Sequence, residues 1–356
     1  MKRPIMIMAG GTGGHVFPAL AVADYLHEKE IPLLWLGTKK GLEARVVPEA
    51  DHRLLTLTIS GVRGVGFLKL LIAPFKILLA VFQAIKIMIN HRPAAVLGMG
   101  GFASGPGGIA AWLMRIPVVI HEQNAIAGMT NKYLAKIATR VFTAFPNTFD
   151  NRNEQHVGNP VRASIVDLKK QTKNNDQIRI LIVGGSLGAS SLNTIVPHAL
   201  SQITNKKEYE LNIWHQTGQG GFDQTQKQYK ALKIKARVEP FLDDIDQAYG
   251  WADFVICRSG ALTVSELAAA GLPSILVPYP HAVDDHQTMN AGYLVDADAA
   301  VIIPDSDLTK EKLASIINDW IDNPGKLIDM SNNAKKVAMT GATERVSNAL
   351  LEVAYG

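Results

Sequence analysis

Three stretches of this chain repeat one pattern, in which a short apolar run is followed by a glycine-rich turn and then by a helix-forming segment. The runs and their turns lie at residues 5–9 with 10–15, 94–97 with 98–105, and 178–183 with 184–188. Near-continuous apolar runs of this length are typical of strands buried on both faces of a parallel sheet. Repeated strand–turn–helix units therefore predict an α/β protein built from doubly wound parallel sheets.

The length of the chain favours two such domains. Its 356 residues exceed the usual size of one domain, and a hydrophobic fraction of 47% is enough for two cores. The polar stretch 167–177 indicates a neighbouring linker, which places the boundary near residues 158–162. Residues 330–354 are expected to form an amphipathic helical segment at the end of the chain.

The stretch 257–291 carries the strongest ligand-binding signal. It is expected to form a strand end, an Arg-Ser-Gly turn, a helix, a short strand and a loop that ends at His286-Gln287. A turn that opens a helix at the carboxyl end of a parallel strand is a common ligand site, and free N–H groups at the helix start attract anions. Glu266, one turn into this helix, suits the vicinal hydroxyls of a ribose. These features indicate a nucleotide site.

Other interpretations of the same residues stay open. Thr263 and Glu266 have the spacing of a capping box, in which the carboxylate only satisfies a backbone N–H. Arg258 could equally be a solvated surface arginine. Cys257 ends an apolar run, which favours a small buried residue over a nucleophile. As the only cysteine it can form no internal disulfide, so we expect a reducing compartment.

Several common site types are disfavoured. The first glycine turn lacks the last glycine of the dinucleotide fingerprint, and no acidic residue ends the second strand near Thr38. The chain has no P-loop motif, and His121-Glu122-Gln123-Asn124 lacks the second histidine of a zincin. Asp296-Ala297-Asp298 resembles an Asp-x-Asp metal clamp but is expected to be solvated surface. The net charge of +4 comes without a nucleic-acid-binding motif, so no nucleic-acid partner is expected.

A tract without acidic residues stands out in the first half of the chain. Residues 52–121 contain no Asp or Glu, whereas 32 acidic residues spread evenly over 356 would place about six there. The tract carries seven lysines and arginines, namely Arg53, Arg63, Lys69, Lys76, Lys86, Arg92 and Arg115.

Residues 67–90 of this tract are almost wholly apolar, with polar positions recurring every seven residues at Lys69, Lys76, Gln83 and Asn90. The segment is too interrupted to span a bilayer, and Pro74 is expected to split it into two helices. It fits a core helix with snorkelling lysines or a patch that binds an anionic membrane surface. The missing acids favour the membrane patch. Its predicted contacts are Phe67, Leu68, Lys69, Leu71, Phe75 and Lys76.

Taken in order, the motifs resemble the MurG family of bacterial peptidoglycan synthesis over nearly the whole chain. The matching stretches are GGTGGHVFPALAVA at 10–23, GMGGFASGPGG at 98–108, IPVVIHEQNAIAGMTNKYLAKIA at 116–138, VGNPVR at 157–162, VGGSLGA at 183–189 and CRSGALTVSELAAAGLP at 257–273. An ordered set of this kind is far more specific than any single glycine turn.

The resemblance implies the inverting transfer of GlcNAc from UDP-GlcNAc to lipid I (undecaprenyl-pyrophosphoryl-MurNAc-pentapeptide), which gives lipid II. It implies a GT-B fold with an acceptor and membrane-associating domain at residues 1–162, onto which a helix at about 340–356 packs, and a UDP-GlcNAc domain at 163–339. It implies no metal and no other cofactor. The implied location is the cytoplasmic face of the bacterial inner membrane, bound peripherally, with cell-wall synthesis and division proteins as further partners.

The resemblance also implies site residues. Glu266 would bind the ribose, the backbone of Leu242 the uracil, and Gln287 and Asn124 the GlcNAc. The remaining expected contacts to UDP-GlcNAc are Thr12, Gly13, Gly14, Arg162, Ser186, Arg258, Ala261, Leu262, Thr263, Val264 and Ser265. The chain departs from some relatives at His286, where a glutamine is common, and at Val65, where a lysine is frequent.

His15 is the candidate catalytic base. In an inverting transfer the acceptor hydroxyl attacks from the face opposite UDP, so a base is expected from the N-terminal domain. An imidazole titrates near working pH and suits that role. Alternatively, His15 only positions the diphosphate or the acceptor.

Two other function classes remain in view. A soluble UDP-sugar enzyme of the same fold, such as an epimerase, would need no acceptor lipid and no basic apolar tract. A non-catalytic scaffold would bind nucleotide or lipid without transfer.

Overall fold

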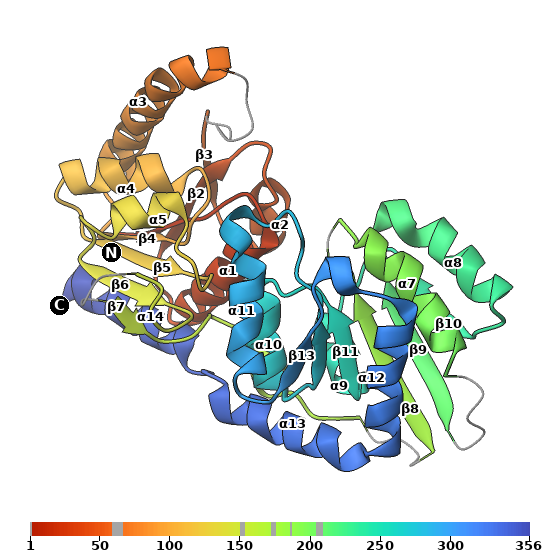
Figure 1. Ribbon diagram of the computed structural model, residues 1–356. Helices are drawn as coiled ribbons and strands as arrows, with labels where there is room; N and C mark the ends of the chain where they lie inside the picture. Colours follow the sequence, from red (N-terminus) through yellow and green to blue (C-terminus); the bar gives the residue numbers. More distant parts are fainter. Residues whose placement is uncertain (1, 59–66, 150–153, 172–175, 186, 204–208) are drawn as a thin grey trace. The chain divides into compact units, whose positions relative to one another are not determined.

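The chain forms two units, of which one contains both chain ends (Figure 1). The first unit consists of Met1–Arg162 and Met339–Gly356, and the second of Ala163–Ala338. The computed structural model describes residues 2–58, 67–149, 154–171, 176–185, 187–203 and 209–356, with only the backbone described at 67–73 and 283.

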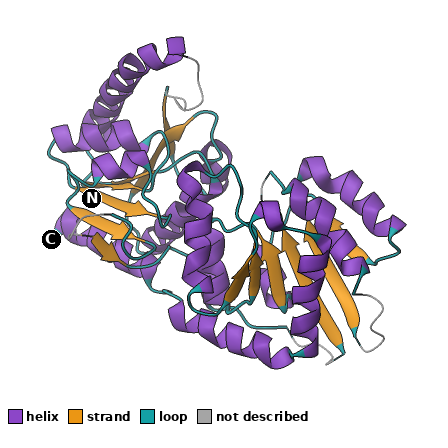
Figure 2. Cartoon of the chain, viewed as in Figure 1, coloured by secondary structure: helices purple, strands orange, loops and turns teal. Residues whose placement is uncertain are grey.

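A parallel sheet forms the centre of the first unit, with helices on both faces (Figure 2). Within the described residues its seven strands lie in the order β3-β2-β1-β4-β5-β6-β7. They are β1 (Ile5–Met8), β2 (Leu33–Thr38), β3 (Leu54–Leu57), β4 (Ala95–Gly98), β5 (Val118–Glu122), β6 (Arg140–Thr143) and β7 (Glu154–His156). Their helices are α1 (Gly13–Glu28), α2 (Glu43–Glu49), α3 (Phe67–His91), α4 (Ser104–Leu113), α5 (Met129–Leu134) and α14 (Ala342–Tyr355).

The strand order reverses at β1, which pairs with β2 on one side and with β4 on the other. Met8 is the register partner of Leu36 in β2 and of Gly98 in β4. In doubly wound sheets, ligands bind outside the carboxyl ends of the strands at such a switch point. The glycine-rich turns that follow β1 and β4 therefore lie where this fold places its ligands.

Alternate side chains of β1 enter two different cores. Ile5 and Ile7 pack with residues of α1 and α14, among them Leu26 and Leu350. Met6 and Met8 belong to the opposite core, together with residues of α3 and α4. The last helix lies beside α1 and so completes a core of the N-terminal unit (Figure 1).

The prediction that Pro74 separates two helices is wrong. α3 continues through Pro74 from Phe67 to His91. The fixed φ of proline is compatible with a helix, so its cost is mainly one lost backbone hydrogen bond and a local clash. Packing of α3 against α4, with Ala84 and Met88 fully buried, offsets that cost.

The described part of α3 is apolar on two sides. Val81, Ala84 and Met88 face the core, whereas Phe75 is 74% and Phe82 60% exposed. One face of α3 therefore covers the core, as the core-helix interpretation expects, and the exposed phenylalanines lie on a second face that a core helix does not require. No helix in the described part of the chain is both long and apolar enough to cross a bilayer.

The second unit repeats the same architecture. Its described sheet has six parallel strands in the order β10-β9-β8-β11-β12-β13, so the order reverses between β8 and β11. The strands are β8 (Gln177–Val183), β9 (Glu210–Gln216), β10 (Ala236–Glu239), β11 (Phe254–Cys257), β12 (Ser274–Leu276) and β13 (Ala300–Ile302). The helices are α6 (Ala163–Val166), α7 (Ser190–Ser201), α8 (Phe222–Ala231), α9 (Ile245–Trp251), α10 (Ala261–Ala270), α11 (His286–Val295), α12 (Lys310–Asp322) and α13 (Pro324–Val337), with 3₁₀ turns η1 (Gln219–Gly221), η2 (Val283–Asp285) and η3 (Asp305–Asp307).

The closing segment is not one helix. α13 ends at Val337 and α14 begins at Ala342, with Ala338 in an extended conformation between them. The two helices belong to different units, so the amphipathic pattern of residues 330–354 serves two separate cores. A local pattern does not reveal which core a helix covers.

Candidate active site

The turn after β1 opens α1 with a glycine in the left-handed region and packs closely against the turn after β4. Gly11 has a φ of +94°, which favours glycine, and α1 begins at Gly13 with the backbone of Thr12 extended before it. A Cβ at Gly101, in the turn after β4, would lie 2.2 Å from the carbonyl oxygen of Gly10. The two turns thus abut at the switch point and present the N–H groups of the α1 start, a suitable place for an anion.

A buried carboxylate holds the first of these turns in place. Glu43 is fully buried, and its Oε2 accepts a hydrogen bond from the Gly11 N–H at 2.9 Å. Its Oε1 accepts from the backbone N–H of Thr38 at 2.9 Å and from the Thr38 hydroxyl at 2.7 Å. Glu43 therefore ties the turn to the end of β2. Sequence analysis missed it, because it follows the second strand by five residues.

The candidate base His15 lies in the first turn of α1 and contacts the loop after β5. Its Nδ1 is 2.8 Å from Oε1 of Gln123, and its backbone N–H donates to the Thr12 carbonyl at 3.1 Å. Gly100 allows the ring to sit there, since a Cβ at that glycine would lie 2.8 Å from Nδ1. The imidazole is half-buried.

Asn124 lies in a loop that is organised by the carboxylate of Glu122. Oε1 of Glu122 accepts from the backbone N–H of Asn124 at 3.0 Å and from its side-chain amide at 3.2 Å. Oε2 accepts from the Gly128 N–H at 3.0 Å and from the Asn131 amide at 2.9 Å. The buried Glu122 thus orients the side chain that sequence analysis assigned to the sugar.

Arg162 also comes close to the start of α1. Its guanidinium lies over the ring of Phe17, 5.5 Å from the ring centroid. The same ring fills the space beside Gly13, where a Cβ would lie 2.9 Å from a Phe17 carbon. The N-terminal unit thus gathers His15, Asn124, Arg162 and the Thr12–Gly14 turn along the carboxyl ends of its central strands.

In the second unit, the glycine turn after β8 is held by a glutamine that sequence analysis did not identify. Gln216 is 2% exposed; its Oε1 accepts from the Gly185 N–H and its Nε2 donates to the Gly185 carbonyl, both at 3.0 Å. The same Nε2 donates to the Pro240 carbonyl at 3.1 Å. Gln216 thereby links the expected diphosphate turn to the loop of Leu242, the expected uracil contact. Ser186 lies outside the described residues.

The helix expected to bind the nucleotide begins earlier than a capping box requires. Gly260 is its N-cap and α10 starts at Ala261, which places Thr263 inside the first turn. The capping-box alternative for Thr263 and Glu266 is therefore wrong. Glu266 is 4% exposed, and its Oε2 accepts a hydrogen bond from the Tyr249 hydroxyl at 3.3 Å. In the same first turns, Ala261 and Val264 are buried, whereas Leu262, Thr263 and Ser265 are half-buried.

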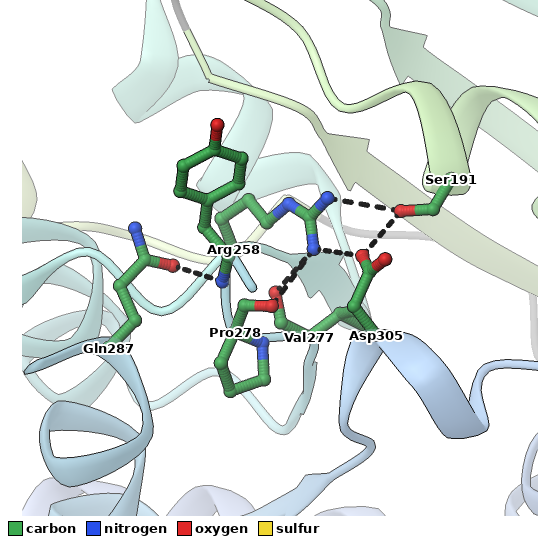
Figure 3. A network of polar contacts seen from close by, with 7 residues as sticks. Ser191, Arg258, Val277, Pro278, Gln287 and Asp305 are labelled. Atoms are coloured by element: carbon green, nitrogen blue, oxygen red, sulfur yellow. Dashed lines mark hydrogen bonds and ion pairs between the residues drawn. The ribbon is translucent and has the colours of Figure 1, made fainter. Parts of the chain in front are cut away.

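Arg258 is the centre of a polar network, so the surface-arginine alternative is wrong (Figure 3). Nη1 donates to the carbonyls of Val277 and Pro278 at 3.1 and 3.0 Å and to Oδ1 of Asp305 at 2.5 Å. Nη2 donates to the Ser191 hydroxyl at 3.0 Å, and that hydroxyl donates to Asp305 at 2.6 Å. The guanidinium joins the ends of β11 and β12 to the starts of α7 and η3.

The loop that leads into α11 is fastened to the same turn. Oε1 of Gln287 accepts from the Tyr279 N–H at 2.8 Å (Figure 3). The Ser259 hydroxyl donates to the Gln287 carbonyl at 2.8 Å. Cys257 is fully buried, and burial raises the pKa of its thiol to about 12. The thiol therefore stays protonated and is not a nucleophile, as its position at a strand end predicts.

Comparison with known proteins identifies both halves of the chain. Residues 5–143 match the N-terminal domain of glycosyltransferase family 28, and residues 179–346 match its C-terminal domain. A relative from Shewanella denitrificans is 51% identical over 360 residues, covering 99% of this chain and 98% of the relative. Its name is UDP-N-acetylglucosamine–N-acetylmuramyl-(pentapeptide) pyrophosphoryl-undecaprenol N-acetylglucosamine transferase.

The chain belongs to the MurG family of glycosyltransferases.

Solved structures agree with this membership. The crystal structure of MurG from Acinetobacter baumannii is 42% identical and superimposes with a TM-score of 0.83 over 98% of this chain and 99% of that one. A putative UDP-N-acetylglucosamine 2-epimerase from Listeria monocytogenes reaches a TM-score of 0.70 at 15% identity, over 99% of this chain and 96% of that one. The second likeness shows the fold alone. The two parallel-sheet units are those of the GT-B fold.

The family motifs coincide with the turns at the two switch points. Within each unit, residues that are far apart in the sequence meet at strand ends. The family pattern did not indicate that Glu43 and Gln216 hold these turns, or that Gln123, within the matching stretch 116–138, contacts His15. No sequence signal marks these three residues, because each has polar residues beside or near it in the sequence and gains its buried partner only through the fold.

Proposed function

We propose that this chain transfers GlcNAc from UDP-GlcNAc to the MurNAc of lipid I, forming lipid II. The observation that carries this proposal is the 51% identity, over 99% of the chain, with a transferase of that name. The reaction forms a bond between an acceptor hydroxyl oxygen and the anomeric carbon, and breaks the bond between that carbon and UDP. The hydroxyl proton must pass to a base, and UDP leaves with the bonding electron pair.

The second unit is proposed to hold UDP-GlcNAc. The buried carboxylate of Glu266 would accept hydrogen bonds from the ribose hydroxyls, and the backbone of Leu242 would bind the uracil. N–H groups at the turn after β8, together with Arg162, would meet the charge that develops on the departing diphosphate. Gln287 and Asn124 would orient the sugar. In this proposal no metal ion takes part.

The resemblance implies that Arg258 contacts UDP-GlcNAc directly, whereas we propose a structural role for it. Its guanidinium already donates to two carbonyls, Ser191 and Asp305. We therefore assign it to shaping the turn around the nucleotide rather than to direct contact with phosphate. The Ser259–Gly260 backbone and the first turn of α10 would make the contact.

The N-terminal unit is proposed to bind the acceptor, with His15 as the base. Wild-type protein should transfer label from radiolabelled UDP-GlcNAc to a lipid I analogue, and His15→Ala should lower turnover by roughly 10²–10⁴-fold, the range for a lost acid–base group. A His15→Ala rate within a few-fold of wild type would reject the base. Conversion of UDP-GlcNAc to another soluble sugar nucleotide without acceptor would instead support the epimerase, and binding without turnover would support a scaffold.

We propose further that α3 binds the cytoplasmic face of the inner membrane peripherally. There the protein would bind its acceptor, lipid I. The exposed Phe75, Leu78, Leu79 and Phe82 form an apolar surface, and the exposed Lys76 adds a cation. Apolar side chains with nearby cations suit an anionic headgroup layer. The side chains of Phe67, Leu68, Lys69 and Leu71 lie outside the described residues.

Liposome flotation tests this surface. Burying a phenylalanine contributes about 1.5–3 kcal/mol, so Phe75→Ser with Phe82→Ser should weaken binding to anionic vesicles by roughly 10²–10⁴-fold. Ile328→Ser is the matched control, because Ile328 lies in α13 of the other unit and is 62% exposed. Equal flotation of the double variant and the control would contradict the membrane proposal.

A further inference from the structure

Four groups of the N-terminal unit form one hydrogen-bonded chain that ends at His15. Nε2 of His121 lies 2.9 Å from the carbonyl oxygen of Gly158. Nδ1 of His121 lies 3.1 Å from Nε2 of Gln123, which also donates to the His121 carbonyl at 3.1 Å. Oε1 of Gln123 lies 2.8 Å from Nδ1 of His15. His121 and Gln123 are both buried, so water cannot replace these partners.

The carbonyl of Gly158 fixes which group donates and which accepts in each of these hydrogen bonds. A carbonyl oxygen only accepts, so Nε2 of His121 must carry a proton. Burial lowers the pKa of His121 to about 4, which keeps its ring neutral and leaves Nδ1 as an acceptor. An acceptor there requires the amide NH₂ of Gln123, and the same NH₂ satisfies the His121 carbonyl. Turning the amide around would place its oxygen against two acceptors.

The consequence reaches His15. With the NH₂ of Gln123 facing His121, its Oε1 faces His15 and can only accept, so Nδ1 of His15 carries the proton. In a neutral imidazole the other nitrogen is then unprotonated. Within the described part of the chain, Nε2 of His15 makes no hydrogen bond. The His15 ring packs against Gly100 in the turn after β4, and this close contact limits rotation of the ring.

We propose that Gln123 is a positioning residue that holds His15 in its Nδ1–H tautomer, with Nε2 free to take the proton of the acceptor hydroxyl. The claim that Nε2 takes this proton rests on the proposed function, because the acceptor hydroxyl loses its proton only in the transfer reaction. In the reaction, the hydroxyl O–H bond would break as Nε2 binds its proton, and the Nδ1–H bond to Gln123 would stabilise the resulting imidazolium. The hydrogen-bonded groups Gly158, His121 and Gln123 fix the orientation and the proton position of the His15 ring without touching substrate.

The tautomer can be read directly by NMR of protein labelled with ¹⁵N at histidine, because the two neutral forms give different ring-nitrogen shifts and couplings. The His15→Ala variant assigns the signals. At a pH where the ring is neutral, wild-type His15 should show Nδ1–H and a bare Nε2. An Nε2–H form in the wild type would overturn the proposal, and this measurement needs no variant at Gln123.

Two variants then test the role of Gln123. Gln123→Met keeps the length of the side chain but removes the acceptor, so the Nδ1–H preference should be lost and kcat should fall by about 10- to 100-fold. The KM for UDP-GlcNAc should stay within about two-fold. Gln123→Glu keeps an oxygen opposite Nδ1 and should retain the Nδ1–H tautomer, but its second oxygen faces the two acceptors of His121 and should lower both stability and rate.

The outcomes separate the two proposals. An unchanged His15 tautomer in Gln123→Met, or a changed tautomer with an unchanged kcat, overturns the positioning role. The tautomer is read without substrate, so a wild-type protein that shows Nδ1–H but transfers no GlcNAc would refute the proposed function and not the proton assignment. Loss of the Nδ1–H tautomer in Gln123→Glu, where an acceptor still faces Nδ1, would also overturn the positioning role.

Discussion

The buried carboxylate of Glu43 offers the sharpest test of how the first glycine turn is held. Replacement by glutamine keeps the shape of the side chain but turns one oxygen into an NH₂ donor. The amide oxygen is expected to keep the two donors of Thr38, which both bind Oε1. The NH₂ would then oppose the Gly11 N–H, so the 2.9 Å bond to Oε2 is lost and two donors face each other.

The magnitude follows from that single loss. A hydrogen bond to a buried charged group contributes about 1.5–3 kcal/mol, so Glu43→Gln should lower the free energy of unfolding by about 2–3 kcal/mol. The turn leads directly into Thr12 and His15, and a displacement of about 1 Å can cost about 10²-fold in rate. We therefore expect kcat to fall by about 10- to 100-fold, with a smaller change in the KM for UDP-GlcNAc.

Thr38→Val provides the matched control, because it removes one hydrogen bond to the same carboxylate but leaves the Gly11 bond intact. It should cost about 1 kcal/mol and keep kcat near wild type. Both variants are compared by urea denaturation and by transfer of labelled GlcNAc to a lipid I analogue. A Glu43→Gln protein that is destabilised yet turns over at the wild-type rate would refute the role of Glu43 in placing the catalytic turn.

Three further predictions follow from the second unit and from the buried histidines. Glu266→Ala should raise the KM for UDP-GlcNAc by about 10- to 100-fold and abolish most of the UDP-induced rise in Tm, whereas an unaltered UDP shift would exclude ribose binding. Arg258→Met should cost about 2–4 kcal/mol of stability with and without UDP alike, because it leaves the partly buried Asp305 carboxylate without its ion pair. A loss confined to UDP affinity would make Arg258 a ligand instead. Burial lowers the pKa of His121 to about 4 and of His215 to about 3, so below pH 6.5 the unfolded chain binds more protons than the folded one. The free energy of unfolding should therefore fall as the pH is lowered from 6.5 toward 4, by up to about 1.4 kcal/mol per pH unit for each histidine. A His215→Asn variant should show a shallower fall of the urea midpoint over that range, and an unchanged slope would contradict the assignment.

Much of the fold could be predicted from local patterns. The apolar runs and glycine turns identified β1, β4 and β8 as parallel strands that end at ligand sites, because period and turn chemistry depend on neighbours in the sequence. Helix boundaries were less certain. The continuous helix through Pro74 and the break between α13 and α14 depend on packing against other elements, which a local pattern does not contain.

By itself, the sequence determined the fold class, the family and the glycine-rich turns at the strand ends, since each depends on contiguous motifs. Tertiary structure decided which side chains hold those turns. Gly11 and Glu43 are 32 residues apart, and His15 and Gln123 are 108 apart. Their hydrogen bonds form only when the parallel strands bring their carboxyl ends together. The proton position on His15 depends on the most distant of these contacts, so it belongs to the folded unit rather than to any one motif.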